Sequence, residues 1–316
     1  MRISRRALLK GAVAAGAATA VAGRAEAREH VEPLPEAVGM LYDSTRCIGC
    51  RACVTKCKEA NKLPYDRIEN GIYDAPTDLN SQTKNVIKVY EQGDRFAFMK
   101  QQCMHCVDPS CVSVCMMGAL HKEGAGKRHL DGEKKGSGIV LYDKYTCVGC
   151  RYCQIGCAFN VPKFEWDEAL PLIVKCELCR HRAKPDAKPG DKFAMANPAC
   201  CEVCPAQAVV YGKRSELLAE AKRRIAAEPK KYEAHVYGEH DGGGTQVLYL
   251  APAGVTFQQL GLPALAEESQ AHFSESVSHA PYLHGVTPVA LYLGMAALIW
   301  NAKKKEAAGE HEKEGK

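Results

Sequence analysis

The apolar residues of this chain fall into short runs with the length and alternation of strands. Residues 41–43 open one run, and residues 245–250 form another. Two further runs, 86–90 and 96–99, flank the turn-forming residues 92–94. The pattern therefore predicts two separate strands and one hairpin.

A helical pattern lies between Ser215 and Ala227, where apolar residues recur on one side. Ser215 has a side chain suited to the N-cap of this helix. The apolar side consists of Leu217, Leu218, Ala221 and Ile225.

Polar segments rich in turn formers separate these elements. Residues 61–85 predict an irregular insertion, and residues 251–282 predict an extended tail over the surface. Residues 122–138 form a basic, glycine-rich loop, which is either a solvated hairpin connection or a docking surface.

An uncharged apolar run, Val286–Trp300, lies near the C-terminus. It is slightly shorter than the roughly 20 residues of a typical membrane helix. Trp300 and the cluster Lys303–Lys305 have the positions of an interfacial anchor and a cytoplasmic flank. We therefore predict a single transmembrane helix over residues 284–303 and a charged tail over residues 304–316, with a buried C-terminal helix as the alternative.

Residues 1–27 have the features of a twin-arginine export signal. The motif Ser-Arg-Arg-Ala-Leu-Leu-Lys at 4–10 precedes a Gly/Ala-rich stretch, and Ala25 and Ala27 frame an A-x-A cleavage site. The alternative is an N-terminal membrane anchor. Signals of this type are known to carry folded proteins, so reduced thiols can receive their metal before export to an oxidising compartment.

The net charge of +5 over 316 residues comes mainly from residues 1–27, which hold five basic residues and one acidic residue. The remaining charge of about +1 gives no reason to expect nucleic acid as a partner. Aromatic residues make up only 7% of a chain that contains 17 Cys. This composition predicts an interior held together by something besides an apolar core.

Sixteen of the 17 Cys fall into four groups of four. The groups are Cys47, Cys50, Cys53, Cys57; Cys103, Cys106, Cys111, Cys115; Cys147, Cys150, Cys153, Cys157; and Cys176, Cys179, Cys200, Cys204. Aligning the C-x3-C of Cys111 and Cys115 with the fourth group selects Cys200 as a ligand and leaves Cys201 as the spare thiol.

The third group has the spacing C-x2-C-x2-C-x3-C, which is the bacterial ferredoxin run for [4Fe–4S] clusters. Three close thiolates wrap one cluster, and the loop turns into a helix that carries the fourth thiolate to a second cluster. Zinc sites favour two pairs of ligands, and disulfide frameworks are typical of short secreted chains. The spacing therefore predicts iron–sulfur clusters, with a zinc-stapled structural module as the alternative of another class.

An internal repeat links the first and third groups. LYDSTRCIGCRAC at 41–53 matches LYDKYTCVGCRYC at 141–153, so Arg51 and Arg151 occupy equivalent places. We interpret both arginines as exposed loop residues, and His105 as a loop histidine without a cluster role. No nucleophile–base pair or phosphate loop stands out, so the predicted function is electron relay without a catalytic site.

Several longer stretches resemble one family, the ferredoxin-like electron-transfer subunits of the hydrogenase-2 type (hydrogenase-2 operon protein A family). The stretches are GMLYDSTRCIGCRACVTKC, KQQCMHCVDPSCVSVC, TCVGCRYCQIGC, VPKFEW, KCELC, CEVCPAQAV and GGGTQVLYL. The resemblance implies that this chain receives electrons from the small subunit of a periplasmic [NiFe] hydrogenase, which connects it to the large subunit. It then passes the electrons to an integral membrane subunit that reduces quinone. The resemblance also implies a place on the periplasmic face of the inner membrane. The alternative is the equivalent subunit of a formate dehydrogenase or another molybdopterin oxidoreductase.

The repeat alone leaves the pairing of the groups open, because a tandem duplication would join groups one with two and three with four. The family resemblance implies nested pairing, of one with four and two with three. The implied ligand sets, named here outer-1, outer-2, inner-1 and inner-2, are Cys47, Cys50, Cys53, Cys204; Cys57, Cys176, Cys179, Cys200; Cys103, Cys106, Cys111, Cys157; and Cys147, Cys150, Cys153, Cys115.

The predicted fold class is accordingly α+β, with two ferredoxin-like 2[4Fe–4S] units, one nested in the other, long loops and the single C-terminal transmembrane helix. Residues 40–100 and 160–230 form the outer unit, and residues 101–159 form the inner unit. Residues 231–283 form a C-terminal extension that leads to the membrane helix. The expected cofactors are four [4Fe–4S] clusters.

Overall fold

The fold was analysed in a computed structural model that describes nine stretches of the chain. These are residues 31–66, 74–93, 95–124, 136–169, 171–182, 197–272, 274–275, 292–301 and 303–304. The predicted signal (1–27) and most of the basic loop (125–135) lie outside the described residues. The chain divides into two compact units, one of residues 30–272 and the other of residues 1–29 with 273–316.

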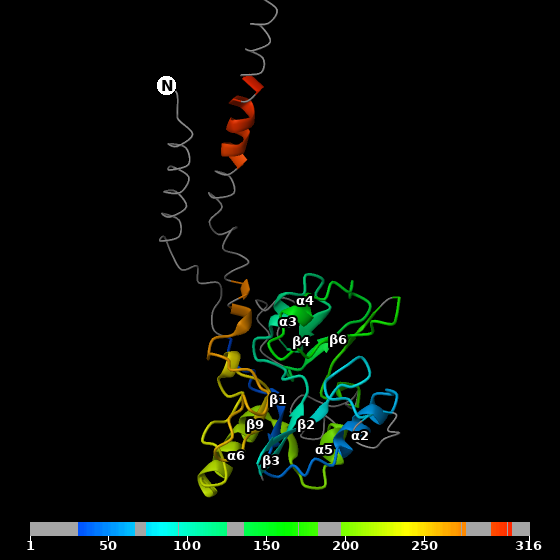
Figure 1. The fold of residues 1–316 in the computed structure, drawn as a ribbon, viewed down its shortest axis with the longest axis vertical. Helices are drawn as coiled ribbons and strands as arrows, with labels where there is room; N and C mark the ends of the chain where they lie inside the picture. The colour runs from blue at the N-terminus through cyan, green and yellow to red at the C-terminus, as the bar shows by residue number, and fades with distance from the viewer. Residues whose placement is uncertain are drawn as a thin grey trace, which may run out of the picture. The chain divides into compact units, whose positions relative to one another are not determined.

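The unit of residues 30–272 is of mixed α and β structure (Figure 1). Its strands are β1 (Val38–Asp43), β2 (Val86–Gln92), β3 (Arg95–Gln101), β4 (Leu120–Lys122), β5 (Val140–Tyr142), β6 (Lys163–Phe164), β7 (Ile173–Val174), β8 (Val209–Lys213) and β9 (Val247–Leu250). Its α-helices are α2 (Ala52–Ala60), α3 (Ser110–Ser113), α4 (Tyr152–Ile155), α5 (Ala199–Glu202) and α6 (Arg214–Ala227). The described residues also include two 3-10 helices, η2 (Arg180–Arg182) and η3 (Asp241–Gly243).

A three-stranded sheet in the order β8-β1-β9 forms the centre of this unit. β1 pairs antiparallel with β8, where Tyr42 faces Val209, and parallel with β9, where Tyr42 faces Tyr249. Met40, Leu41 and the residues up to Asp43 are fully buried, because β1 has a neighbouring strand on both edges and side chains packed on both faces. The sequence predicted β1 and β9 as separate strands; their pairing joins segments more than 200 positions apart.

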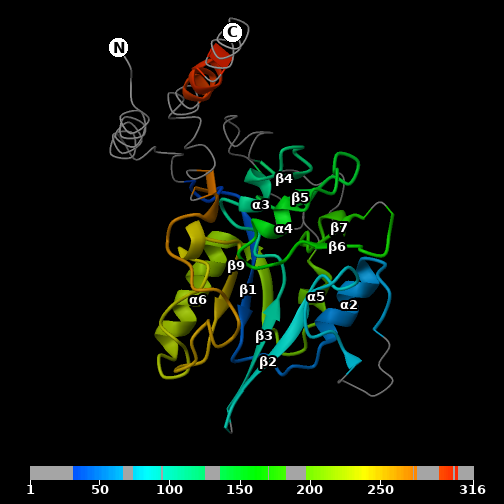
Figure 2. The ribbon, with the colours of Figure 1, turned by 45° about the horizontal axis from the view of Figure 1, so that its top comes forward.

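Strands β2 and β3 form the predicted hairpin, with Gly93 at a positive φ of 58° in the turn. A glycine tolerates this conformation without the strain of a Cβ atom. The hairpin runs from residue 86 to residue 101, longer than the predicted strands, and projects from the unit in Figure 2. Its inner part carries Met99 and Lys100 into the interior, next to the cysteine groups.

The internal repeat folds as two similar strand–helix arrangements. β1 pairs with β8 while α2 packs against α5; β4 pairs with β5 while α3 packs against α4. The two LYD triplets occupy equivalent registers, because Tyr42 faces Val209 and Tyr142 faces Leu120. Figure 1 shows α3, α4 and β4 at one end of the unit and α2 and α5 at the other.

The helix predicted to start after Ser215 begins two residues earlier, at Arg214, and its N-cap is Lys213 without a side-chain hydrogen bond. The Ser215 N-cap prediction was therefore wrong. Strand β8 runs directly into α6, and the Arg214 side chain anchors the junction by donating to the carbonyl of Thr245 at 2.7 Å and that of Gly238 at 3.1 Å. The apolar side is as predicted: Leu217 and Ala221 are buried, and Leu218 and Ile225 pack against them.

The prediction of an extended tail over the surface is wrong for residues 251–272. This stretch contributes buried side chains to the main core, and its chain runs in turns. The buried members are Ala251, Val255, Phe257, Leu260 and Leu262. This packing makes residues 251–272 part of the unit that holds the cysteine groups.

In the other unit, residues 292–301 and 303–304 are helical. Residues 284–291 of the predicted membrane helix lie outside the described residues. Among the described residues, the structure contains no helix with the length and apolar character needed to span a membrane.

Candidate metal centres

The thiols of outer-1 surround one pocket. Cys47, Cys50 and Cys53 line it from the loop before α2 and from α2 itself, and Cys204 lines it from the segment between α5 and β8. Burial, together with the neighbouring thiols of Cys200, Cys47 and Cys204, raises the pKa of Cys53 to about 12. A site that gathers so many thiols away from water disfavours their free thiolate forms.

The thiols of outer-2 line a second pocket, beside the first. Cys57 comes from α2, Cys200 from α5, and Cys176 and Cys179 from the loop between β7 and η2. Burial raises the pKa of Cys57 to about 11, with added repulsion from Cys200 and Cys179. The packing of α2 against α5 therefore brings the first and last groups of the chain together.

The inner sets form in the same way around α3 and α4. Burial raises the pKa of Cys106, and the thiols of Cys157 and Cys103 add to the effect. Burial likewise raises the pKa of Cys111, and the thiols of Cys157, Cys103 and Cys106 add to the effect. The four thiols of inner-1 therefore lie close together.

The last set, inner-2, is marked by Cys153 on α4. Burial, together with the neighbouring thiols of Cys115, Cys147 and Cys150, raises the pKa of Cys153 to about 12. Cys115 comes from the segment between α3 and β4, just as Cys204 comes from between α5 and β8.

All sixteen thiols predicted as ligands are thus near the other members of their predicted sets, in the nested arrangement. The sets also adjoin one another: Cys53 interacts with Cys200, and Cys176 interacts with Cys103. This places outer-1 next to outer-2 and outer-2 next to inner-1. Their role as cluster ligands remains a prediction.

The backbone of the repeated motif turns in the same way at both copies. Gly49 and Gly149 have φ of +69°, and Arg51 and Arg151, at the N-caps of α2 and α4, have φ of 59° and 66°. The turns direct the Gly49 amide to the Cys47 sulfur at 3.5 Å and the Gly149 amide to the Cys147 sulfur at 3.4 Å. Such N–H donors stabilise negative charge on sulfur.

Cys115 and Cys204 each accept a backbone hydrogen bond, from the fifth residue after Cys115 and from the fourth residue after Cys204. The amide of Leu120 donates to the Cys115 sulfur at 3.5 Å, and that of Ala208 donates to the Cys204 sulfur at 3.3 Å. Only the first copy of the repeat carries its last cysteine on a helix, because α2 includes Cys57 whereas α4 ends at Ile155, before Cys157. Gly156, a poor helix former, stands where α2 has Lys56.

Cys201 lies beside outer-2 but is not among the residues that line its pocket. The adjacent Cys201 thiol lowers the pKa of Cys200, and Cys200 in turn raises the pKa of Cys201. The lining of the pocket, which includes Cys200 but not Cys201, agrees with Cys200 as the ligand.

Sequence reasoning missed three buried lysines next to these thiols: Lys100, Lys122 and Lys175. The Lys122 ammonium donates to the Cys106 carbonyl at 2.7 Å, and the Lys175 ammonium donates to the carbonyls of Val140 and Cys176. A lysine in a chain segment of mixed polarity normally lies at the surface, so no signal in the sequence marks these three.

His105, which we expected to be a loop histidine without a cluster role, is fully buried. Its Nδ1 accepts a hydrogen bond of 3.0 Å from the Val140 amide, and burial lowers its pKa well below the usual range. His105 therefore ties the segment between Cys103 and Cys106 to strand β5.

The donor sets fit [4Fe–4S] clusters. Each consists of four thiols, the ligands that such clusters use, and a bound metal would remove the thiol protons and offset the repulsion between thiolates. Among the described residues, no three His, Cys, Asp or Glu side chains converge closely enough to hold a single metal ion. A four-iron cluster is larger than one ion, so its thiolates stand farther apart than the ligands of zinc.

Comparisons with known proteins agree with this chemistry. A family model described as a 4Fe-4S dicluster domain matches residues 95–214. The hydrogenase-2 operon protein HybA of Escherichia coli O157:H7 is 38% identical over 326 aligned residues, which cover 94% of this chain and 93% of that protein. The chain belongs to the HybA family.

Members of a neighbouring group are also similar to this HybA-family chain. The iron–sulfur subunit of the nitrate-inducible formate dehydrogenase of Escherichia coli K12 is 33% identical, with 67% of each chain covered. The formate dehydrogenase-O iron–sulfur subunit of the same organism is 32% identical over 72% of this chain and 73% of that protein. The chain is therefore an iron–sulfur electron-transfer subunit of the hydrogenase-2 or formate dehydrogenase type.

Proposed function

We propose that this chain relays electrons through four [4Fe–4S] clusters, bound by outer-1, outer-2, inner-1 and inner-2, without a catalytic site of its own. The observation that carries the proposal is the gathering of four separate sets of four thiols. When bound, such clusters exchange electrons at potentials set by their surroundings. The chain's own residues supply thiolates, backbone amides and burial.

The succession of the sets supports a relay rather than four isolated sites. Thiols of outer-1 and outer-2 interact through Cys53 and Cys200, and outer-2 meets inner-1 through Cys176 and Cys103. Inner-1 and inner-2 share helix α3 and the segment that follows it, through Cys111 and Cys115. The end members, outer-1 and inner-2, each include an exposed cysteine, Cys50 or Cys150. An exposed ligand at each end suits a relay between two partners.

The proposed partners are the small subunit of a periplasmic [NiFe] hydrogenase at one end and a quinone-linked integral membrane subunit at the other. Similarity to HybA over 94% of the chain supports this choice. The second candidate is the equivalent role in a formate dehydrogenase or another molybdopterin oxidoreductase, which the similarity to formate dehydrogenase subunits supports over a smaller share of the chain. Identifying the subunits that co-purify with the detergent-extracted complex separates the two.

The cluster number is tested by iron and acid-labile sulfide analysis of anaerobically purified protein. Four cubanes require about sixteen iron and sixteen sulfide per chain. An iron content of about twelve per chain would show that one cluster is absent. Outer-2 would then be the first set to examine, because its ligands come from three segments of the chain. If the protein is colourless and contains zinc, the result would support a zinc-stapled structural module in place of an electron relay.

Location is part of the same proposal: twin-arginine export, with the C-terminal segment as an anchor and its lysines on the cytoplasmic side. Deletion of residues 286–316 is expected to release a brown periplasmic protein, whereas the full chain remains with the membrane. Truncated protein that still sediments with membranes lacking the partner subunits would refute the anchor. Changing Arg5 and Arg6 to Lys is expected to leave the protein in the cytoplasm.

A further inference from the structure

Lys100 lies in the interior without a carboxylate partner. It is 1% exposed, on the strand β3 opposite Ile87, and its ammonium donates a hydrogen bond to the side-chain oxygen of Gln102. No ion pair joins Lys100 to a carboxylate anywhere in the part of the chain that the structure describes. The equally buried Lys58, in contrast, pairs with Asp66 at 2.6 Å.

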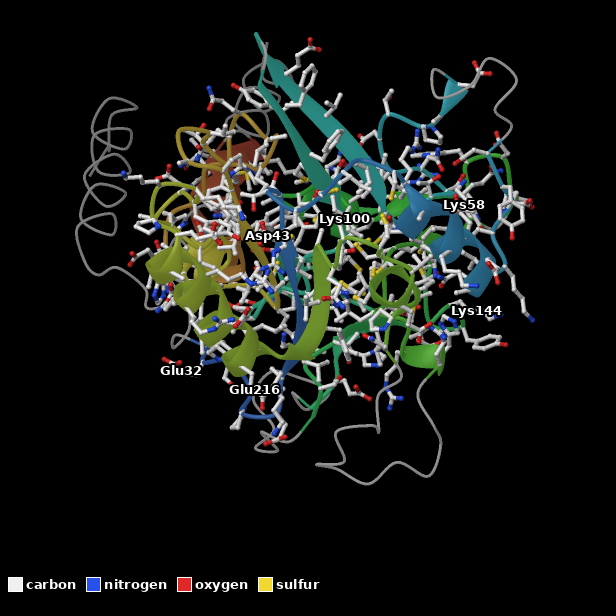
Figure 3. All side chains as sticks on the ribbon, turned by 90° about the horizontal axis from the view of Figure 1, so that it is seen from below. Glu32, Asp43, Lys58, Lys100, Lys144 and Glu216 are labelled. Carbon is white, nitrogen blue, oxygen red and sulfur yellow. The ribbon has the colours of Figure 1, made fainter. Side chains whose placement is uncertain are left out.

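A buried ammonium with one neutral partner is costly, because its charge loses hydration without gaining a counter-charge. Lys100 interacts electrostatically with thiols of the two outer sets, Cys53 of outer-1 and Cys176 and Cys200 of outer-2. Gln102, the hydrogen-bond partner of Lys100, lines the outer-2 pocket together with Cys176 and Cys200. Figure 3 shows Lys100 in the interior, near sulfur atoms.

We propose that Lys100 is a fixed positive charge shared by the clusters of outer-1 and outer-2, and that it raises the reduction potential of both. The inference rests on the proposed function, because it requires clusters at these sets. A cluster gains one negative charge when it is reduced, so a nearby cation stabilises the reduced form more than the oxidised form. Because Lys100 raises both outer potentials, it favours electron occupancy of the clusters at the outer end of the relay.

The inner sets have a lysine of their own. Lys122 is 5% exposed, its ammonium donates to the Cys106 carbonyl at 2.7 Å, and it interacts with the thiols of Cys106 and Cys111 in inner-1. Unlike Lys100, it has a carboxylate nearby, since Asp108 also interacts with it. Lys122 therefore supplies a matched control, a buried lysine beside a different cluster.

The test is a redox titration of the full-length protein in detergent, monitored by electron paramagnetic resonance, for the parent, Lys100→Met and Lys122→Met. Methionine keeps the length of the side chain and removes its charge. In Lys100→Met we expect two of the four one-electron steps to move to lower potential, each by about a tenfold change in the reduced-to-oxidised ratio, or about 59 mV for one electron. In Lys122→Met those two steps stay in place, and a step assigned to inner-1 moves instead.

Charge conservation is tested with Lys100→Arg, which is expected to keep the two outer potentials above those of Lys100→Met. Iron content is measured first in every variant. Unchanged potentials in Lys100→Met at full iron content overturn the inference. Loss of iron from both Lys100→Met and Lys100→Gln also overturns it, because Lys100 would then be needed for assembly. Parent protein with fewer than four clusters counts against the proposed function instead.

Discussion

Arg224 and Asp43 form an ion pair of 3.0 Å that joins the last turn of α6 to the end of β1. The Asp43 side chain is fully buried, and it also accepts hydrogen bonds from the Tyr232 hydroxyl at 3.0 Å and the Thr45 hydroxyl at 2.6 Å. Asp43 stands four residues before Cys47, so the pair fixes the point where the first cysteine loop leaves the sheet.

Replacing Arg224 by methionine is expected to destabilise the fold, because the buried Asp43 carboxylate keeps only the longer contact of 3.5 Å with the more exposed Arg46 as its counter-charge. Breaking a buried ion pair by removing one partner costs about 3–5 kcal/mol. The measurement is the midpoint of anaerobic urea unfolding. The neighbouring Arg223, 70% exposed at its side chain and paired with Glu220, is the control. Arg223→Met is expected to change stability by about 0.5 kcal/mol or less, and equal effects of the two changes would contradict the prediction.

Gly39 and Gly212 face each other across β1 and β8 but differ in the space around them. A Cβ atom on Gly39 would lie 1.9 Å from the carbonyl oxygen of Gln246, just before β9. A Cβ atom on Gly212 would meet only the Leu217 side chain, at an ordinary 3.6 Å.

Gly39→Ala is therefore expected to lose about 3 kcal/mol through overpacking against backbone, whereas Gly212→Ala is neutral or slightly stabilising because alanine suits a strand better. Thermal unfolding of the two variants, side by side, makes the comparison. A Gly39→Ala protein as stable as the parent would show that β1 and β9 do not approach so closely.

The equivalent glycines of the two cysteine loops offer another matched pair. Both have φ of +69°, so alanine costs about 1–2 kcal/mol of backbone strain at either position. At Gly49 the new methyl group also meets the Phe98 ring at 2.4 Å, while at Gly149 nothing lies within 4 Å.

We expect Gly49→Ala to lose iron to a chelator faster than Gly149→Ala does. The double variant Gly49→Ala with Phe98→Ala should recover most of the difference. Equal iron loss from the two single variants, or no recovery in the double variant, would exclude the Phe98 contact as the cause.

Cys200 and Cys201 are adjacent, but only Cys200 lines the pocket of outer-2. Cys201→Ala is expected to retain all four clusters, and Cys200→Ala is expected to lose about four iron atoms, one cubane. Iron analysis together with spin quantification after reduction gives the answer. The reverse result would assign the ligand role to Cys201.

Local features of the fold were predictable from the sequence, because nearby residues determine them. The hairpin of β2 and β3 follows from two apolar runs around Gly93, and the four cysteine groups follow from spacing alone. The start of α6 was misplaced because the contacts of Arg214 with distant carbonyls outweigh the capping preference of Ser215.

Features that depend on distant partners were not predictable. Phe257 and Leu260 show no periodic pattern, yet they are buried in the main core. Lys100 follows an apolar strand and reads as its polar end, but the fold places it among thiols that are up to 100 positions away. Burial of a charge depends on the surroundings that the whole chain creates, which a single stretch does not encode.

The central place of β1 sets a condition on synthesis. Residues 38–43 leave the ribosome early, but their neighbours on the two edges, residues 209–213 and 247–250, are made about 170 and 200 residues later. Until then the nascent chain exposes an apolar strand with open edges, the kind of surface on which chains aggregate. The cysteines of the central groups, by contrast, have all been made once residue 157 emerges. Maturation of this protein thus has a built-in order, from the middle of the chain outward, and its earliest strand needs protection until residue 250 has been made.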